Sequence, residues 1–175
     1  GRAGALGRVF VGLGWGGGGG GVVSVAEVVF NTAMVGYQES LTDPSYNGQI
    51  LVQTFPLIGN YGTNPEDVES VKVQVSGFVI RELARRHSNY RADDSLEGYL
   101  AKAGVLGITG IDTRALTRTL RSGGSTTGVL TGRADLSDAD MVKMAKEAPS
   151  MAGRRRWGIG RSRRARPMAA SGSGC

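Results

Sequence analysis

The 175-residue chain divides into three parts of different composition and charge. Seven of its 21 Lys and Arg lie between Arg154 and Arg166, so subtracting them leaves residues 1–153 with 14 basic and 15 acidic side chains. Residues 1–21 hold 11 of the 29 glycines, well above the usual share of about 7%. We therefore expect an atypical glycine-rich segment over 1–21, one folded domain over 22–153 and an Arg-rich, disordered tail over 154–175.

Composition also excludes several classes of protein. The single cysteine, Cys175, is the last residue, which excludes a disulfide framework and a Cys-based metal cluster, and we expect no metal site. No apolar stretch reaches 18 residues, and residues 1–21 lack the apolar region of a signal peptide, so we expect a cytoplasmic protein without membrane contact. The chain begins with Gly rather than Met, which indicates processing or an incomplete sequence.

The first half of the chain favours strands separated by polar connections. Residues 8–11 and the β-branched residues 22–30 predict strands, and the six consecutive glycines at 16–21 predict a mobile loop between them. Residues 36–48 are dense in turn formers and in side-chain hydrogen-bond donors and acceptors, with Asp43-Pro44 suited to a tight turn. We expect this stretch to be a functional loop.

Further strands are expected beyond that loop. Residues 50–52 predict a buried strand, and residues 55–62 return to turn chemistry. Valines at positions 71, 73 and 75 alternate with polar residues, which is the period of a strand with one wet face, and residues 78–80 extend it. This alternation makes residues 71–80 the clearest strand of the sequence.

The second half predicts three helices, with short strands over 105–108 and 126–131 between them. Gly104 ends the first helix and Gly123-Gly124 the second. The expected N-caps are Asp93 or Asp94, then Asp112, then Ser137. The mixture indicates an α/β fold in which strands outnumber helices.

Nucleotide binding is disfavoured by the context of its one matching motif. Residues 12–17 fit G-x-G-x-x-G, but more glycines and a strand pattern follow instead of the helix that a pyrophosphate site requires. A Walker loop is excluded because no Gly-Lys-Ser/Thr is present. We interpret the match as an accident of the glycine run.

The residues usually found in hydrolytic sites are few. His87 is the only histidine and lies in a polar, Arg-rich stretch, which favours a solvated loop residue. Cys175 lies in a Ser-Gly tail with no neighbouring base that could lower its pKa. We therefore expect no catalytic residue in this chain.

Two groups of arginines are candidates for contacts with partners. Arg114, Arg118 and Arg121 form a stripe at helical spacing. A solvated face is favoured over a contact with a partner or an anion, and a partner interface is the secondary interpretation. The tail after Gly153 combines seven arginines with Trp157, a composition that suits phosphate contacts and base stacking. A reading-frame change in a GC-rich gene explains the tail equally well, and composition leaves both interpretations open.

Three stretches together resemble the N-terminal domain of the small, glutamine-hydrolysing subunit of carbamoyl-phosphate synthase. The resemblance runs in order from about residue 7 to residue 153. Its motifs are VVFNTAMVGYQE and LTDPSY within 28–46, PLIGNYGTN at 56–64 with Glu69-Ser70, and GITGIDTRALTR at 107–118. The resemblance implies a swivelling β/β/α fold with layered mixed sheets and about three helices.

The resemblance also implies a role within a larger enzyme. In this family the domain packs on a class I amidotransferase domain and on the large synthetase subunit, and glutamine is the substrate of the complete small subunit. The assembled ligase uses glutamine, bicarbonate and ATP to make carbamoyl phosphate for pyrimidine and arginine synthesis, with ammonia passing through a tunnel. ATP and Mg are expected on the large subunit only, and this chain is expected to hold no cofactor.

The resemblance also implies a role for one residue of this chain. The family's serine in the Thr-Asp-Pro-Ser-Tyr stretch contacts glutamine, and that position is Ser45 here, where a hydroxyl can donate and accept. The family's catalytic Cys and its His-Glu pair have no counterpart in this sequence, so we expect the isolated chain to be inactive as a glutaminase.

The leading hypothesis is accordingly the N-terminal domain of a small subunit that supports glutamine hydrolysis and ammonia delivery without the glutaminase domain. Two alternatives stay open at this point. One is a free-standing adaptor that docks on the large subunit. The other is nucleic-acid binding through the Arg-rich tail, which we regard as less favoured.

Overall fold

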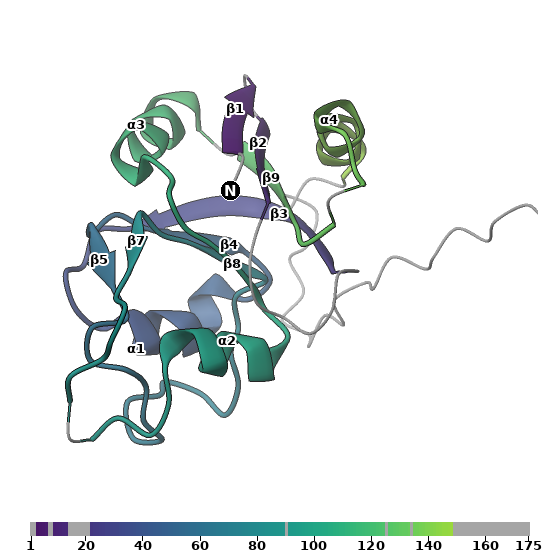
Figure 1. Ribbon diagram of the computed structural model, residues 1–175. Helices are drawn as coiled ribbons and strands as arrows, with labels where there is room; N and C mark the ends of the chain where they lie inside the picture. Colours follow the sequence, from purple (N-terminus) through teal and green to yellow (C-terminus); the bar gives the residue numbers. More distant parts are fainter. Residues whose placement is uncertain are drawn as a thin grey trace, which may run out of the picture.

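The computed structural model describes residues 3–6, 9–13, 22–89, 91–124, 126–133 and 135–148. The described part forms one mixed sheet of seven strands in the order β1-β2-β9-β3-β4-β6-β8, beside a small pair, β5-β7 (Figure 1). The strands are β1 (Ala3–Leu6), β2 (Val9–Leu13), β3 (Val23–Asn31), β4 (Ile50–Gln53), β5 (Leu57–Ile58), β6 (Gly77–Val79), β7 (Glu82–Leu83), β8 (Leu106–Ile108) and β9 (Thr126–Thr131).

The sheet changes direction at β3. On one side, β3, β4, β6 and β8 are parallel, with Val28 opposite Ile50 and Ile50 opposite Gly77. On the other side, β9 runs antiparallel to β3, β2 parallel to β9 and β1 antiparallel to β2. The four parallel strands need three crossover connections, and helices lie in two of them. The α-helices are α1 (Tyr37–Thr42), α2 (Leu96–Ala103), α3 (Thr113–Gly123) and α4 (Asp138–Glu147), with a 3-10 turn, η1 (Pro44–Tyr46).

Alternating residues of β3 divide the core between the two faces of the sheet. Ala26 and Val28 lie in the cluster that α3 covers, whereas Val29 packs toward α1 and α2 and Val25 toward α4. In Figure 1, α1 and α2 lie below the parallel strands and α3 above them, while α3 and α4 flank the raised end of the sheet. This arrangement confirms the layered α/β class expected from the sequence.

Several predicted elements are confirmed. The strands expected near 8–11, 22–30, 50–52, 105–108 and 126–131 all form, within about two residues of their expected ends. Asp112 caps α3 by accepting a hydrogen bond from the Ala115 amide at 2.9 Å, and Ser137 caps α4 in a capping box with Asp140. Residues 14–21 and 149–175, including the glycine run, Cys175 and the Arg-rich tail, lie outside the described residues.

The strand expected over 71–75 is wrong, although β6 forms just after it. Val71 is fully exposed, and residues 71–76 are not part of any strand. The backbone of Gln74 instead bonds to the chain around η1, because its amide donates to Leu41 at 2.8 Å and its carbonyl accepts from Gly48 at 2.9 Å. The alternating residues therefore belong to a segment that bonds to α1 and to the turn after it, and not to a strand of the sheet.

The expected N-cap of α2 is also wrong. Ser95, not Asp93 or Asp94, caps this helix, with its hydroxyl accepting from the Gly98 amide at 3.1 Å. Asp94 has other partners, since its carboxylate accepts from the Ser95 amide and lies 2.8 Å from the Lys102 ammonium. The hydrogen bond from Lys102 lowers the pKa of Asp94 below its usual value.

The largest departure from expectation is helical structure in residues 36–48. The expected polar loop contains α1 and η1, so the described part has four α-helices where about three were expected. Five of the six residues of α1 are buried, among them Tyr37 and Leu41. A helix that is buried nearly all round needs no apolar face on one side only. Its residues therefore show no helical repeat of apolar positions from which the helix could be predicted. Among the described residues no helix is long and apolar enough to cross a membrane.

Candidate functional site

The turn that carries Ser45 is built by Asp43 at the end of α1. Asp43 ends α1 and caps η1, and its carboxylate accepts the Ser45 amide at 2.7 Å. Pro44 occupies the first position of η1, where its fixed φ suits a helical turn and no amide hydrogen is needed. These contacts engage the backbone of Ser45 and leave its side chain exposed. Among the described residues the Ser45 hydroxyl has no hydrogen-bond partner.

Side-chain hydrogen bonds hold the turn on both sides. Tyr46 accepts a hydrogen bond from Asn31, at the end of β3, at 3.4 Å, and Asn31 also bonds to Ser40 of α1 at 3.0 Å. On the other side, the Asn47 amide group donates to the side-chain oxygen of Gln74 at 2.8 Å. The arrangement presents one free hydroxyl on a fixed turn, which can donate to or accept from a polar ligand.

The second motif, at 56–64, lies directly against the first. The Tyr61 hydroxyl accepts hydrogen bonds from the amides of Gly36 and Tyr37, at 2.7 and 3.1 Å. The Tyr37 hydroxyl donates in return to the carbonyl of Gly62 at 2.5 Å, and the two rings stack with centroids 4.1 Å apart. Burial raises the pKa of both phenols, so both hydroxyls stay protonated at neutral pH.

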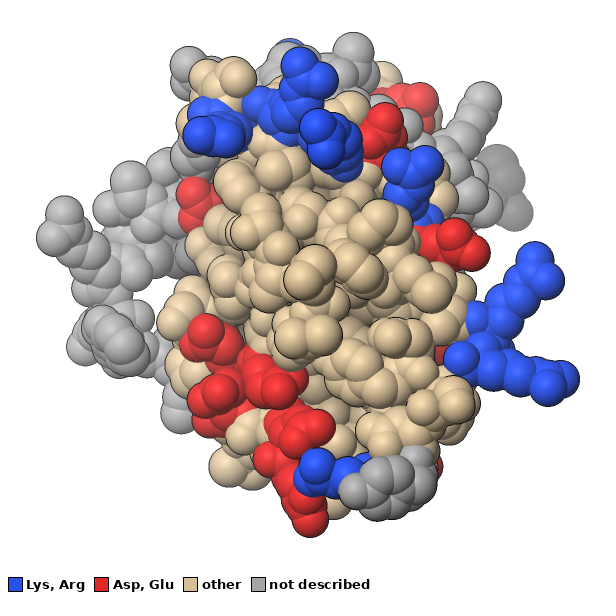
Figure 2. Space-filling view, turned by 90° about the vertical axis from the view of Figure 1, so that its left-hand side faces the viewer, with Lys and Arg blue, Asp and Glu red and all other residues tan. Residues whose placement is uncertain are grey.

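The third motif holds the start of α3 and the candidate arginine interface. Arg114, Arg118 and Arg121 are all exposed, and none of them forms an ion pair within the described residues. Figure 2 shows Lys and Arg side chains gathered at the upper edge of one face, at the height of α3 in Figure 1, above a broad uncharged area. The helix thus presents three arginines that form no ion pair with the described part of the chain.

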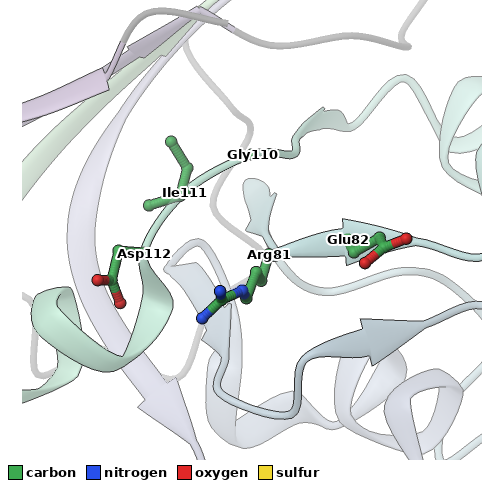
Figure 3. Close-up of a pocket in the computed structure, with 5 residues that line it drawn as sticks. All are labelled: Arg81, Glu82, Gly110, Ile111 and Asp112. Atoms are coloured by element: carbon green, nitrogen blue, oxygen red, sulfur yellow. The ribbon is translucent and has the colours of Figure 1, made fainter.

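A recess that the sequence did not reveal lies beside the start of α3. It has a volume of about 420 Å³ and is lined by Arg81, Glu82, Gly110, Ile111 and Asp112. In Figure 3 the side chain of Arg81 extends in the direction of Asp112, whereas the side chain of Glu82 points away from both residues. Its residues follow β6 and β8, where ligands commonly bind in parallel sheets, and this position after two strands is the signal that could have found it.

The recess and Ser45 lie at different ends of the parallel strands. The turn with Ser45 precedes β4 and bonds to residues that precede β6, whereas the recess follows β6 and β8. The structure therefore does not bring Ser45 and the recess into one site. His87 is exposed in a loop, as expected, and no described group of His, Cys, Asp and Glu is arranged to hold a metal ion.

Comparisons with known proteins assign the chain to a family. The family model of the carbamoyl-phosphate synthase small chain, CPSase domain, matches residues 5–130. The small chain of Akkermansia muciniphila is 54% identical over 147 residues, covering 84% of this chain and 38% of the relative. That of Syntrophotalea carbinolica is 51% identical over 150 residues, covering 86% and 39%, and that of a Synechococcus species 55% over 129 residues, covering 74% and 33%.

The chain thus spans between a third and two fifths of the length of these relatives. The matched region includes all three motifs, the Ser45 turn and the arginines of α3. By this match the chain belongs to the carbamoyl-phosphate synthase small-chain family.

Proposed function

We propose that this domain supports glutamine hydrolysis by a carbamoyl-phosphate synthase small chain in the cytoplasm and helps to deliver the ammonia to the large subunit. The family match over residues 5–130 supports this role. The carbamoyl phosphate would serve pyrimidine and arginine synthesis. ATP and Mg belong to the large subunit in this proposal, and the domain contributes binding and docking rather than chemistry. The chain alone should release no glutamate from glutamine above the buffer rate, and clear release would contradict this role.

The observation that carries the proposal is the free hydroxyl of Ser45 within an intact family motif. An exposed serine whose amide is fixed by Asp43 and whose hydroxyl has no partner in the described chain is suited to contact a ligand held by another domain. Glutamine offers a carboxylate, an ammonium and an amide, each of which can pair with a hydroxyl. Ser45 would therefore contribute to glutamine binding and not to bond breaking.

Ser45→Ala tests this role in an assembled synthase. For this test, the chain replaces the matched region in the small chain of Akkermansia muciniphila, which supplies the other regions of a small chain. We expect the KM for glutamine to rise about tenfold, because one hydrogen bond to a charged or polar group is lost, while kcat changes little. An unchanged KM would remove Ser45 from the glutamine site.

Arg114, Arg118 and Arg121 are proposed to contact the large subunit. Three exposed arginines without carboxylate partners in the described chain favour a surface that carries acidic residues. Replacing all three by Glu should weaken binding of the large subunit and reduce its salt dependence. The matched control replaces Lys72, Arg85 and Arg86 by Glu, which makes the same charge change at exposed positions elsewhere. Equal loss in both variants would indicate a general charge effect and contradict the proposed interface.

A further inference from the structure

Residues 61–76 wrap around the α1–η1 unit, and we call them the strap. The strap begins with the Tyr61 hydroxyl at the first amides of α1 and ends with Gln74 beside the turn of Ser45. It is itself held at the start of α2, where Thr63 and Asp94 form a bridge, with the Thr63 amide donating to the Asp94 carbonyl at 3.0 Å. The strap therefore connects a well-packed part of the domain with the exposed turn.

Tyr61 takes the place of the missing N-cap of α1. The N-cap position is Gly36, which has a φ of 80° and no side chain that could accept a hydrogen bond. The first amides of any helix lack partners within the helix, and here the Tyr61 hydroxyl accepts two of them. The start of α1 is thus set by a residue 24 positions further along the chain.

The strap also holds the second and the last residue of α1. Gln38, which is fully buried, pairs both atoms of its amide with the backbone of Asn64, accepting from its N–H at 2.9 Å and donating to its carbonyl. The Thr42 hydroxyl accepts from the Glu69 amide at 2.9 Å, and the Ser70 hydroxyl donates to the Thr42 carbonyl at 2.5 Å. Hydrogen bonds therefore tie both ends of α1 to the strap.

Within the turn after α1, Pro44 and Ser45 are exposed and only Tyr46 is half-buried, where it packs against the core cluster of α1 and α2. The position of Ser45 therefore depends on the helix before it, on Tyr46 and on Gln74 after it. A displacement of α1 against the strap would move Asp43, whose carboxylate fixes the Ser45 amide. A ligand contact of one hydroxyl tolerates only small displacements, because hydrogen bonds weaken steeply beyond their normal range.

We propose that Tyr61 is a positioning residue for glutamine binding, acting through α1 on Ser45. The proposal rests on the proposed function of Ser45 as a glutamine contact and extends it to a residue of the second motif. The first two motifs would then act together, because the second motif holds the first in the position from which Ser45 can contact glutamine. Tyr61 itself is expected to touch neither glutamine nor the reacting atoms.

The test compares Tyr61→Phe with Ser137→Ala in the assembled synthase described above. Phe keeps the ring and its stacking on Tyr37 but removes the acceptor of two amides. Ser137→Ala removes the cap of α4, a comparable hydrogen-bond loss far from Ser45. We expect Tyr61→Phe to raise the KM for glutamine about three- to fivefold, and Ser137→Ala to leave it unchanged. The rate with ammonia as nitrogen donor reports intact assembly in both variants.

The double variant Ser45→Ala/Tyr61→Phe tests whether the effect of Tyr61 on the KM for glutamine acts through Ser45. If Tyr61 acts through Ser45, the KM of the double variant equals that of Ser45→Ala alone. Multiplicative effects would overturn the proposal while leaving the role of Ser45 intact. If Ser45→Ala alone has no effect on KM, the proposed function of Ser45 fails first, so the two failures can be told apart.

Amide hydrogen exchange of the chain itself gives a readout that does not depend on activity. In Tyr61→Phe we expect faster exchange at the Gly36 and Tyr37 amides and also at the Ser45 amide, which Asp43 otherwise holds. Faster exchange at Gly36 and Tyr37 with no change at Ser45 would show that the strap stabilises α1 without positioning the turn, and would overturn the proposal.

Discussion

Helices α1 and α3 both carry family motifs, but they are stabilised in different ways. α3 has 11 residues, a side-chain cap at Asp112 and a buried row that includes Leu116 and Leu120, opposite an exposed row of arginines. α1 has six residues, begins at a glycine without a side-chain cap and buries five of its six side chains. Local sequence therefore specifies α3, whereas contacts with a distant segment specify α1.

The largest expected difference concerns Gly62, where the strap passes the segment just before α2. A methyl group there would lie 2.6 Å from the Ala92 side chain and 2.9 Å from the Asp94 carbonyl, at a φ of 69°. Gly62→Ala should therefore lower the free energy of unfolding by about 3 kcal/mol, from crowding and left-handed strain together. Gly104→Ala is the matched control, because Gly104 has the same φ and nothing within 4 Å.

Urea unfolding of both variants measures this difference. The control should lose only about 1 kcal/mol, the cost of the left-handed conformation. Equal losses would mean that the strap yields easily at Gly62, which would contradict the idea that it fixes α1.

The next effect isolates the tie between α1 and the strap. Gln38→Leu should lower the free energy of unfolding by about 2 kcal/mol, because it leaves the buried amide and carbonyl of Asn64 without partners. The control is Gln49→Leu, which removes a partly exposed hydrogen bond to Glu27 and should cost less than about 0.5 kcal/mol. Chemical unfolding gives both values, and a loss at Gln38 no greater than at Gln49 would show that the buried pair adds nothing.

The smallest effect is expected where the sequence alone specifies the structure. Asp112→Ala removes the cap of α3 and should cost about 1 kcal/mol. Ser122→Ala, on the exposed last turn of the same helix, should change the stability by less than about 0.5 kcal/mol. Thermal unfolding with circular dichroism distinguishes the two. A cost at Asp112 above that at Gln38 would reverse the contrast between the helices.

The contrast explains which parts of the structure could be predicted. The caps Asp112 and Ser137 and the strand over 126–131 follow from local chemistry, and the structure confirms them. The strand expected over 71–75 failed because the backbone of Gln74 bonds to the turn of Ser45, a partner that local alternation does not reveal. α1 was missed for the related reason that its cap, Tyr61, lies in another motif.

The candidate site was only partly predictable for the same reason. Ser45 could be singled out because its motif is intact, and the structure shows its side chain to be exposed on a fixed turn. The roles of Tyr61, Gln38 and Gln74 depend on hydrogen bonds between segments more than 20 residues apart, which no period or spacing in the sequence encodes. The recess beside Arg81 depends likewise on the meeting of two strand ends.

The role of Ser45 is tested most directly by the structure of an assembled synthase that contains this domain, with glutamine or an unreactive analogue bound. We expect the Ser45 Oγ to lie within about 3.2 Å of a polar atom of the ligand, with the hydrogen bonds from the Gly36 and Tyr37 amides to the Tyr61 hydroxyl intact. A ligand bound in its pocket with the Ser45 Oγ beyond hydrogen-bond reach, and no water between them, would contradict this role.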